Sequence, residues 1–249
     1  MSRVASSSSA LTGQAGVMPR PVGVSRRAAL GAVSMLGAPA AWLAAPSLAH
    51  AGGQLEEPLM DSVRTALSSA IANQAPPEPE FFTTEARLHY LRWLGTQSDR
   101  LRRRKPEWEV RRDFLQTVWY ESKRAGLDVS LVLGLIQVES AFRKFAVSSV
   151  GARGYMQVMP FWTRVIGDGD PGKLFHMQTN LRFGCVILRH YIDRERGDLF
   201  MALGRYNGSR GKSPYPNAVF AAQRNWLFSE RPQLPPSPAA PNPLVAAAS

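Results

Sequence analysis

The chain has 249 residues, with 30 Lys or Arg against 19 Asp or Glu, which gives a formal net charge of +11. Its single cysteine, Cys185, excludes an intrachain disulfide and a cysteine cluster for a metal ion. The basic balance favours a polyanionic partner: nucleic acid, a membrane surface or a cell-wall polymer.

Residues 1–51 contain no Asp or Glu and have the pattern of a signal peptide. A long n-region ends at Arg26-Arg27, an apolar run follows, and Ala49-His50-Ala51 is a small-x-small cleavage pattern. The run is rich in Ala and Gly and contains a proline, so we expect cleavage and not a permanent membrane span. The protein is therefore expected to be exported, to the periplasm if the cell has an outer membrane. Because the arginine pair resembles a twin-arginine signal, the Sec and twin-arginine routes both stay open.

Residues 52–125 are predicted to form a helical extension with a linker. One weakly amphipathic helix is expected between Leu59 and Ile71, before a Pro-rich segment at 76–79. Two more helices are expected within 83–125, the first with Leu88, Leu91 and Leu94 on its apolar face. The basic run at 100–105 between them lacks interleaved aromatic residues, so it is typical of a solvated face and not of a nucleic-acid site.

Residues 126–228 are predicted to form a compact helical domain. Its helices are expected at 128–140, from Met156 to Ile166, around Leu181 to Ile192, after a capping Asp198, and near 217–226. Cys185 is expected to be a small buried hydrophobic residue of the third of these helices. Residues 229–249, rich in Pro and Ala, are predicted to be a disordered tail. No β-alternation persists, so the fold class is all-α.

Glu139 is an acid on the apolar side of a helix predicted to be buried. Helical spacing puts it in line with Val132, Leu135 and Ile136. Burial disfavours the charged form of a carboxyl and raises its pKa, which keeps an acid protonated near neutral pH. Taken alone, Glu139 could equally be a structural glutamate at a helix end.

Three ordered motifs favour the catalytic reading. Glu139-Ser140 is followed by Gly154-Tyr155-Met156-Gln157 in a glycine-containing loop, and then by Ala202 to Gly208, which includes Tyr206-Asn207. Together they resemble the catalytic domain of soluble lytic transglycosylases, lysozyme-like enzymes that cut peptidoglycan. The resemblance covers residues 126–228 and implies a lysozyme-like helical fold.

The resemblance also implies roles for individual residues. Glu139 would be the catalytic acid, and the sugar-binding groove would be lined by Ser148, Gln157, Met159, Tyr206 and Asn207. Tyr206 would in addition touch the Glu139 carboxyl and help to hold its proton. Peptidoglycan glycan strands would be the substrate, with no cofactor, no metal and no nucleic acid, and the protein is expected to be a monomer.

The next acids after Glu139, Asp168 and Asp170, have the Gly and Pro neighbours of turn residues. Without a second catalytic carboxylate, the family's substrate-assisted route applies: the C6 hydroxyl of the muramic acid residue attacks its own anomeric carbon, giving a 1,6-anhydro end. A hydrolytic muramidase and a catalytically silent wall-binding module remain alternatives.

Three positions depart from the family pattern. Tyr155 stands where Leu is usual, Arg205 stands where a small residue is usual, and Gly208-Ser209 stands where Ala-Gly is common. Since these positions surround the motifs and leave the acid in place, we expect them to change the shape of the groove before they change activity.

Overall fold

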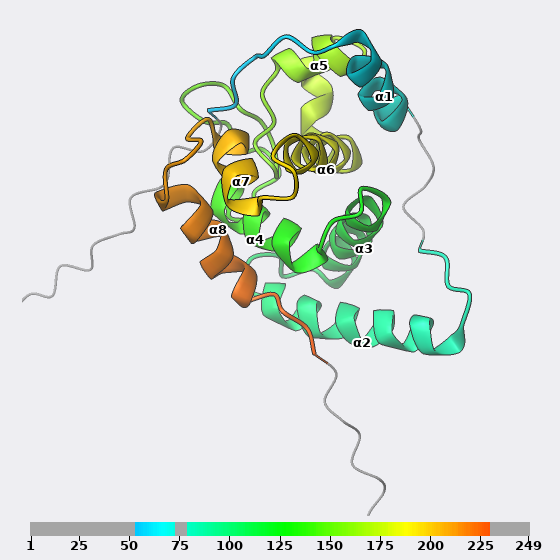
Figure 1. The fold of residues 1–249 in the computed structure, drawn as a ribbon. Helices are drawn as coiled ribbons and strands as arrows, with labels where there is room; N and C mark the ends of the chain where they lie inside the picture. The colour runs from blue at the N-terminus through cyan, green and yellow to red at the C-terminus, as the bar shows by residue number, and fades with distance from the viewer. Residues whose placement is uncertain (1–52, 73–78, 230–249) are drawn as a thin grey trace, which may run out of the picture. The chain divides into compact units, whose positions relative to one another are not determined.

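The computed structural model describes residues 53–72 and 79–229, and within them the fold is all-α, as predicted. The predicted signal peptide and nearly all of the predicted tail lie outside the described residues. Eight α-helices and one 3₁₀ helix make up this part of the chain (Figure 1). They are α1 Asp61–Ala72, α2 Thr84–Leu101, α3 Trp108–Arg124, α4 Val129–Ser140, α5 Phe161–Ile166, η1 Pro171–Phe175, α6 Met177–Arg194, α7 Leu199–Asn207 and α8 Pro214–Arg224.

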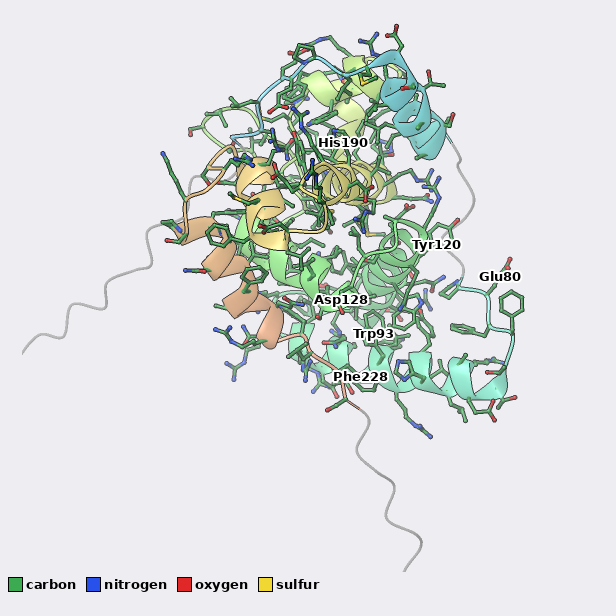
Figure 2. All side chains as sticks on the ribbon, in the orientation of Figure 1. Glu80, Trp93, Tyr120, Asp128, His190 and Phe228 are labelled. Carbon is green, nitrogen blue, oxygen red and sulfur yellow. The ribbon has the colours of Figure 1, made fainter. Side chains whose placement is uncertain are left out.

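Helix α4 is almost wholly buried, in keeping with a sequence that is apolar on every face. The side chain of Asp128, labelled in Figure 2, caps its first turn by accepting a hydrogen bond from the backbone N–H of Leu131 at 2.9 Å. At the other end, Ala141 adopts a left-handed conformation that ends the helix directly after Ser140. Glu139 therefore lies in the last turn of a rigid, buried helix.

The closest approach of two helices joins α4 to α8, which make the most extensive interhelical contact among the described residues. Gly134 permits it, because a Cβ at this position would lie 2.7 Å from the backbone nitrogen of Gln223. The backbone of α8 thus rests directly on α4, and this contact fixes the position of α8 relative to Glu139.

Helices α3 and α6 are joined by an ion pair in the interior. Both side chains are buried, and Arg182 on α6 donates to the Glu121 carboxylate on α3 at 2.8–3.3 Å. Cys185 on α6 is buried, as predicted, and burial raises the pKa of its thiol, so it remains a protonated packing residue.

Two local predictions were wrong. The leucine face of α2 is reversed, since Leu88 and Leu91 are exposed while Tyr90, Trp93 and Leu101 are buried. Aromatic stacking explains the reversal, because Trp93 packs against Trp119 of α3 with ring centroids 4.6 Å apart. The helix expected from Met156 begins only at Phe161, because Arg153 and Val158 instead form an isolated antiparallel bridge.

Helix α1 lies where a helix was predicted, but none of its residues is buried. It contacts α5 and α6, with Leu67 and Ile71 partly buried against the core. Among residues 53–72 and 79–229, no helix has the length and apolar character needed to cross a bilayer, and no cluster of His, Cys, Asp and Glu is suited to a metal ion.

Candidate active site

Glu139 is a buried acid with one hydrogen-bond partner among the described residues. Its side chain is 5% exposed, and its Oε1 accepts a hydrogen bond from the Tyr215 hydroxyl at 2.5 Å. The other oxygen, Oε2, is buried without a partner in this part of the chain. Burial raises the pKa of Glu139 to about 8, against a smaller opposite effect of the Tyr215 hydrogen bond. The carboxyl is therefore protonated at neutral pH.

Tyr215 was missed by sequence reasoning, which placed the start of the last helix near Asn217. Helix α8 begins instead at Pro214, and Tyr215 lies in its first turn. The signal was present in the sequence, because proline is favoured at the first helical position. Burial raises the pKa of the Tyr215 hydroxyl well above its ordinary value, so it stays a hydrogen-bond donor.

The predicted contact between Tyr206 and the Glu139 carboxyl is wrong in its partner. Tyr206 is fully buried, and its hydroxyl donates to the backbone carbonyl of Met156 at 2.8 Å. It is still near enough for the charge of Glu139 to contribute to the raised pKa of its phenol, after the larger effect of burial. Tyr206 thus joins α7 to the Gly154–Gln157 loop, and Tyr215 is the tyrosine bonded to the acid.

Ser148 and Gln157 shape the loop that follows α4. The Ser148 hydroxyl accepts from the backbone N–H of Ala152 at 3.0 Å, which closes a turn. Gln157 is buried in a left-handed conformation with φ 48°, and its side-chain amide donates to the carbonyls of Ala146 at 3.1 Å and Gly154 at 2.9 Å. Both side chains hold the loop by these contacts, and their predicted role in binding sugar stays a prediction.

Met159 and Asn207 are both partly exposed, and an N-terminal segment contacts each of them. The backbone N–H of Met159 donates to Oε1 of Gln54 at 3.3 Å. A Cβ on Gly53 would overlap the carbonyl oxygen of Asn207. Sequence reasoning had given residues 53–57 no role, because they form no regular element.

Tyr155, the first departure from the family pattern, contacts the basic run at 100–105. The ammonium of Lys105 donates to its hydroxyl at 2.9 Å and lies 4.7 Å from its ring centroid and 5.1 Å from that of Phe114. Lys105 is buried, and burial lowers its pKa. This cation is therefore structural, whereas Arg102, Arg103 and Arg104 are exposed, as expected of a solvated face.

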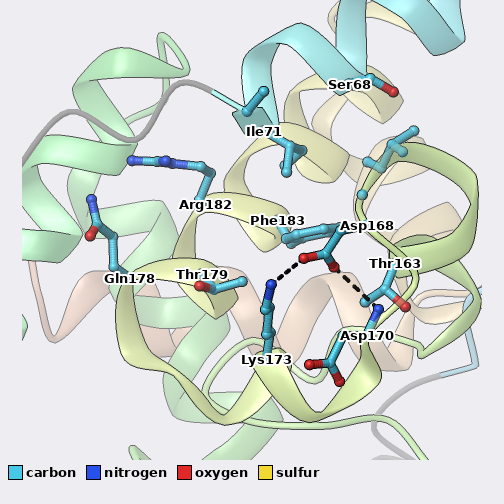
Figure 3. A pocket seen from close by; sticks show the side chains of 13 residues that line it. Ser68, Ile71, Thr163, Asp168, Asp170, Lys173, Gln178, Thr179, Arg182 and Phe183 are labelled. Atoms are coloured by element: carbon cyan, nitrogen blue, oxygen red, sulfur yellow. Dashed lines mark hydrogen bonds and ion pairs between the residues drawn. The ribbon is translucent and has the colours of Figure 1, made fainter.

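Asp168 and Asp170 are turn residues, as predicted. Asp170 caps η1 by accepting from the backbone N–H of Gly172 at 2.8 Å, and exposed Asp168 pairs with Lys173. Both aspartates line a cavity of about 420 Å³ whose wall includes Ile71 of α1 and Phe183 of α6 (Figure 3). The influences on the pKa of Glu139 are burial and Tyr215, with no contribution from another described carboxylate.

The arrangement provides one protonated carboxyl with a raised pKa, a fixed orientation and no second carboxylate acting on it. Such a group can donate a proton to a leaving oxygen and, once ionised, can take a proton back from an attacking hydroxyl. Metal chemistry has no ligand cluster in the described residues.

Comparison with known proteins identifies the same region. Residues 116–225 match the family model "Transglycosylase SLT domain". A "Membrane-bound lytic murein transglycosylase C" from Glaesserella parasuis is 55% identical over 89 residues, which cover 32% of this chain and 24% of that protein. A protein of the same name from Haemophilus ducreyi is 47% identical over 142 residues, covering 51% of this chain and 38% of that protein.

Among solved structures, a lytic transglycosylase Slt from Pseudomonas aeruginosa is 27% identical with a TM-score of 0.34, covering 59% of this chain and 24% of that chain. The chain thus spans about a quarter to two fifths of the length of these relatives. The match to the family model includes α4, α8 and all three motifs. Residues 116–225 are a transglycosylase SLT domain, and the relatives of this chain are lytic murein transglycosylases.

Proposed function

We propose that the protein is a peptidoglycan lytic transglycosylase that cleaves the β-1,4 bond from N-acetylmuramic acid to N-acetylglucosamine. The observation that carries the proposal is the buried Glu139 carboxyl, whose pKa is raised to about 8 and which Tyr215 orients. A carboxyl used as a general acid must hold its proton at the working pH, and this one does.

The proposed reaction needs one carboxyl and no water. Glu139 gives its proton to the glycosidic oxygen as the bond from that oxygen to C1 of the muramic acid residue breaks. The N-acetyl group of this residue stabilises the positive charge that develops at C1. The C6 hydroxyl of the same sugar then attacks C1, and its proton passes to the Glu139 carboxylate. The acid is regenerated, and the product ends in a 1,6-anhydro sugar.

The same bond could be hydrolysed by a muramidase, which would place a water molecule where the C6 hydroxyl attacks. Glycosidases of the two-carboxylate type hold their second carboxyl roughly 5–10 Å from the first. The absence of a described carboxylate among the influences on Glu139 favours the intramolecular route. A silent wall-binding module is disfavoured, because such a module has no use for a buried, protonated glutamate, which is costly to keep.

Export to the compartment that contains the wall belongs to the same proposal. It rests on the signal pattern of residues 1–51 and on the names of the relatives, which describe membrane-bound murein enzymes. The remaining excess of basic residues suits a substrate that carries carboxylates on its stem peptides. We expect a monomer that needs no cofactor.

The test is to incubate the protein with purified peptidoglycan and to determine the masses of the released muropeptides. We expect muramyl ends one water lighter than the reducing sugar. Reducing ends would replace the proposal with a hydrolytic muramidase, and binding without release would replace it with the wall-binding module. Glu139→Gln keeps the size and hydrogen-bonding capacity of the side chain but has no proton to donate, so it should abolish release without loss of fold.

A further inference from the structure

Residues 53–57, here called the strap, pass over one part of the candidate groove. Gln54 is 3% exposed, and its Oε1 accepts hydrogen bonds from the backbone N–H of Met159 at 3.3 Å and from the Trp162 indole N–H at 3.0 Å. Gly53 lies against the carbonyl of Asn207. Burial raises the pKa of Tyr206, and the Gln54 side chain beside it opposes that shift. The strap therefore contacts three of the five residues predicted to line the groove.

An ion-pair network anchors the strap at its other end. The Glu57 carboxylate bonds to Arg194 and to Arg205, each at 2.7 Å. Arg205 also bonds to Glu195 at 2.7 Å, and Glu195 in turn bonds to Arg210. Arg205 and Glu195 have side chains only 16% and 8% exposed, so the network is partly shielded from water. Such a network holds its members better than an isolated surface pair does.

Two of the three departures from the family pattern are contacts to the strap. Arg205, where a small residue is usual, is a partner of Glu57. Gly208, where Ala is common, has φ 77°, and a Cβ there would overlap the carbonyl oxygen of Gly53. The sequence of α7 thus departs from its relatives at the places where the strap needs a cation and free space.

The contacts fall on one side only. Met159, Tyr206 and Asn207 are touched by the strap, while Ser148 and Gln157 bond within their own loop. An open groove accepts the interior of a polymer, whereas a groove blocked on one side of the acid accepts only its terminus. Gln54 also occupies the Met159 N–H, which is then not available to a sugar.

We propose that the strap is a fixed stop that closes the Met159–Asn207 end of the groove and restricts cleavage to the ends of glycan strands. This inference rests on the proposed function, since it concerns the same groove and the same polymer. It assigns a specificity role to Gln54 and Glu57, neither of which contacts the catalytic carboxyl.

The test compares the full chain with a Gln54→Ala/Glu57→Ala double variant. Glu56→Ala is the matched control, because it removes the same charge one residue away, where Glu56 forms only an exposed pair with Arg164 at 3.6 Å. Circular dichroism and thermal unfolding check that all three proteins are folded. With long-stranded peptidoglycan, at equal numbers of cleaved bonds, the mean length of the remaining strands should fall several-fold more for the double variant than for the other two. Equal strand lengths would overturn the stop.

A second readout does not depend on catalysis. In a Glu139→Gln background, binding of N-acetylglucosamine oligomers of increasing length is measured by calorimetry. With the strap intact, the affinity should level off at a short oligomer, and in the double variant it should continue to rise with length. A continued rise with the strap intact, or no binding by either protein, would overturn the stop. If the affinity levels off as expected but peptidoglycan is not cut, the proposed function fails and the stop stands.

The stop is also distinguished from a cover that substrate displaces. Saturating oligomer should leave hydrogen exchange at the Trp162 indole N–H unchanged, because that group stays bonded to Gln54. Exchange that accelerates with oligomer would mean that the strap leaves the groove, and this would overturn a fixed stop.

Discussion

The acid strength of Glu139 is set by burial, and this predicts the pH dependence of turnover. With a pKa raised to about 8, the carboxyl holds its proton below that pH and loses it above. Because the proposed first step consumes this proton, kcat/KM should fall about tenfold per pH unit above about 8. A pH–rate profile on soluble glycan checks this. A falling limb near pH 5, as for an exposed glutamate, would contradict it.

Tyr215→Phe should slow turnover and shift the alkaline limb upward. The Tyr215 hydrogen bond lowers the pKa of Glu139, so its loss leaves a weaker and less well oriented acid. A hydrogen bond to a charged group contributes about 1.5–3 kcal/mol, which corresponds to a loss of roughly 10- to 100-fold in kcat. The pH–rate profile of the variant provides the measurement.

Tyr206→Phe is the matched control. It removes a hydroxyl that bonds to the Met156 carbonyl, so we expect a partial loss of turnover and a cost of about 1–3 kcal/mol in stability. Its alkaline limb should stay where the unaltered protein has it. If Tyr206→Phe shifted the limb and Tyr215→Phe did not, the two tyrosines would have exchanged the parts given to them here.

The Lys105–Tyr155 contact joins the loop after α2 to the catalytic loop, and it predicts a graded effect on stability. Tyr155→Phe removes the hydrogen bond to a buried ammonium but keeps a ring facing it, at a cost of about 1–2 kcal/mol. Tyr155→Leu, which restores the family residue, also removes the ring and should cost more. Urea unfolding of both variants gives the comparison, and an equal or smaller cost for Leu would contradict it.

The helices could be predicted where one chain segment decides the outcome. Asp128 and Asp198 cap α4 and α7 as expected, because a capping side chain bonds to its own first turn. The exposed face of α2 could not be predicted, because Trp119 of α3 determines it. Residues 156–160 read as helical, yet a bridge from Arg153 to Val158 holds them in a loop.

The candidate site divides in the same way. Glu139 could be recognised because its apolar neighbours lie on the same helix. Its partner Tyr215 lies 76 residues away, and only the close packing of α8 on Gly134 brings the two together. The strap was missed for the same reason, since Gln54 reaches Met159 across 105 residues and has no local pattern.

For the folded molecule as a whole, the raised pKa of Glu139 is a cost in stability that grows with pH. The unfolded carboxyl ionises near its ordinary pKa of 4.5, whereas the folded one retains its proton to about 8. Between these values the folded state binds more protons, so its stability falls as pH rises. Glu139→Gln removes this cost. Its advantage in free energy of unfolding should be near zero at pH 4 and reach at most about 5 kcal/mol at pH 8. Urea unfolding at both pH values checks the widening, and a constant difference would contradict it.

The exposed arginines after α2 predict a salt-dependent attraction to the wall. Arg102, Arg103 and Arg104 are exposed, and of these Arg102 pairs with Asp99 at 2.8 Å. Replacing all three by Gln should weaken cosedimentation with purified sacculi at low salt, and the difference should disappear at high salt as screening increases. Unchanged sedimentation at low salt would assign these cations another role.

The approach of α8 to α4 also has a consequence for how the chain is made. Glu139 precedes Tyr215 in synthesis by 76 residues, so a ribosome must complete most of the domain before the acid meets its partner. Until α8 docks, the carboxyl is an ordinary glutamate in an incomplete chain. If the exported chain is threaded unfolded, the acid first acquires its catalytic pKa next to the wall. If it is carried across already folded, it leaves the cytoplasm with its proton in place.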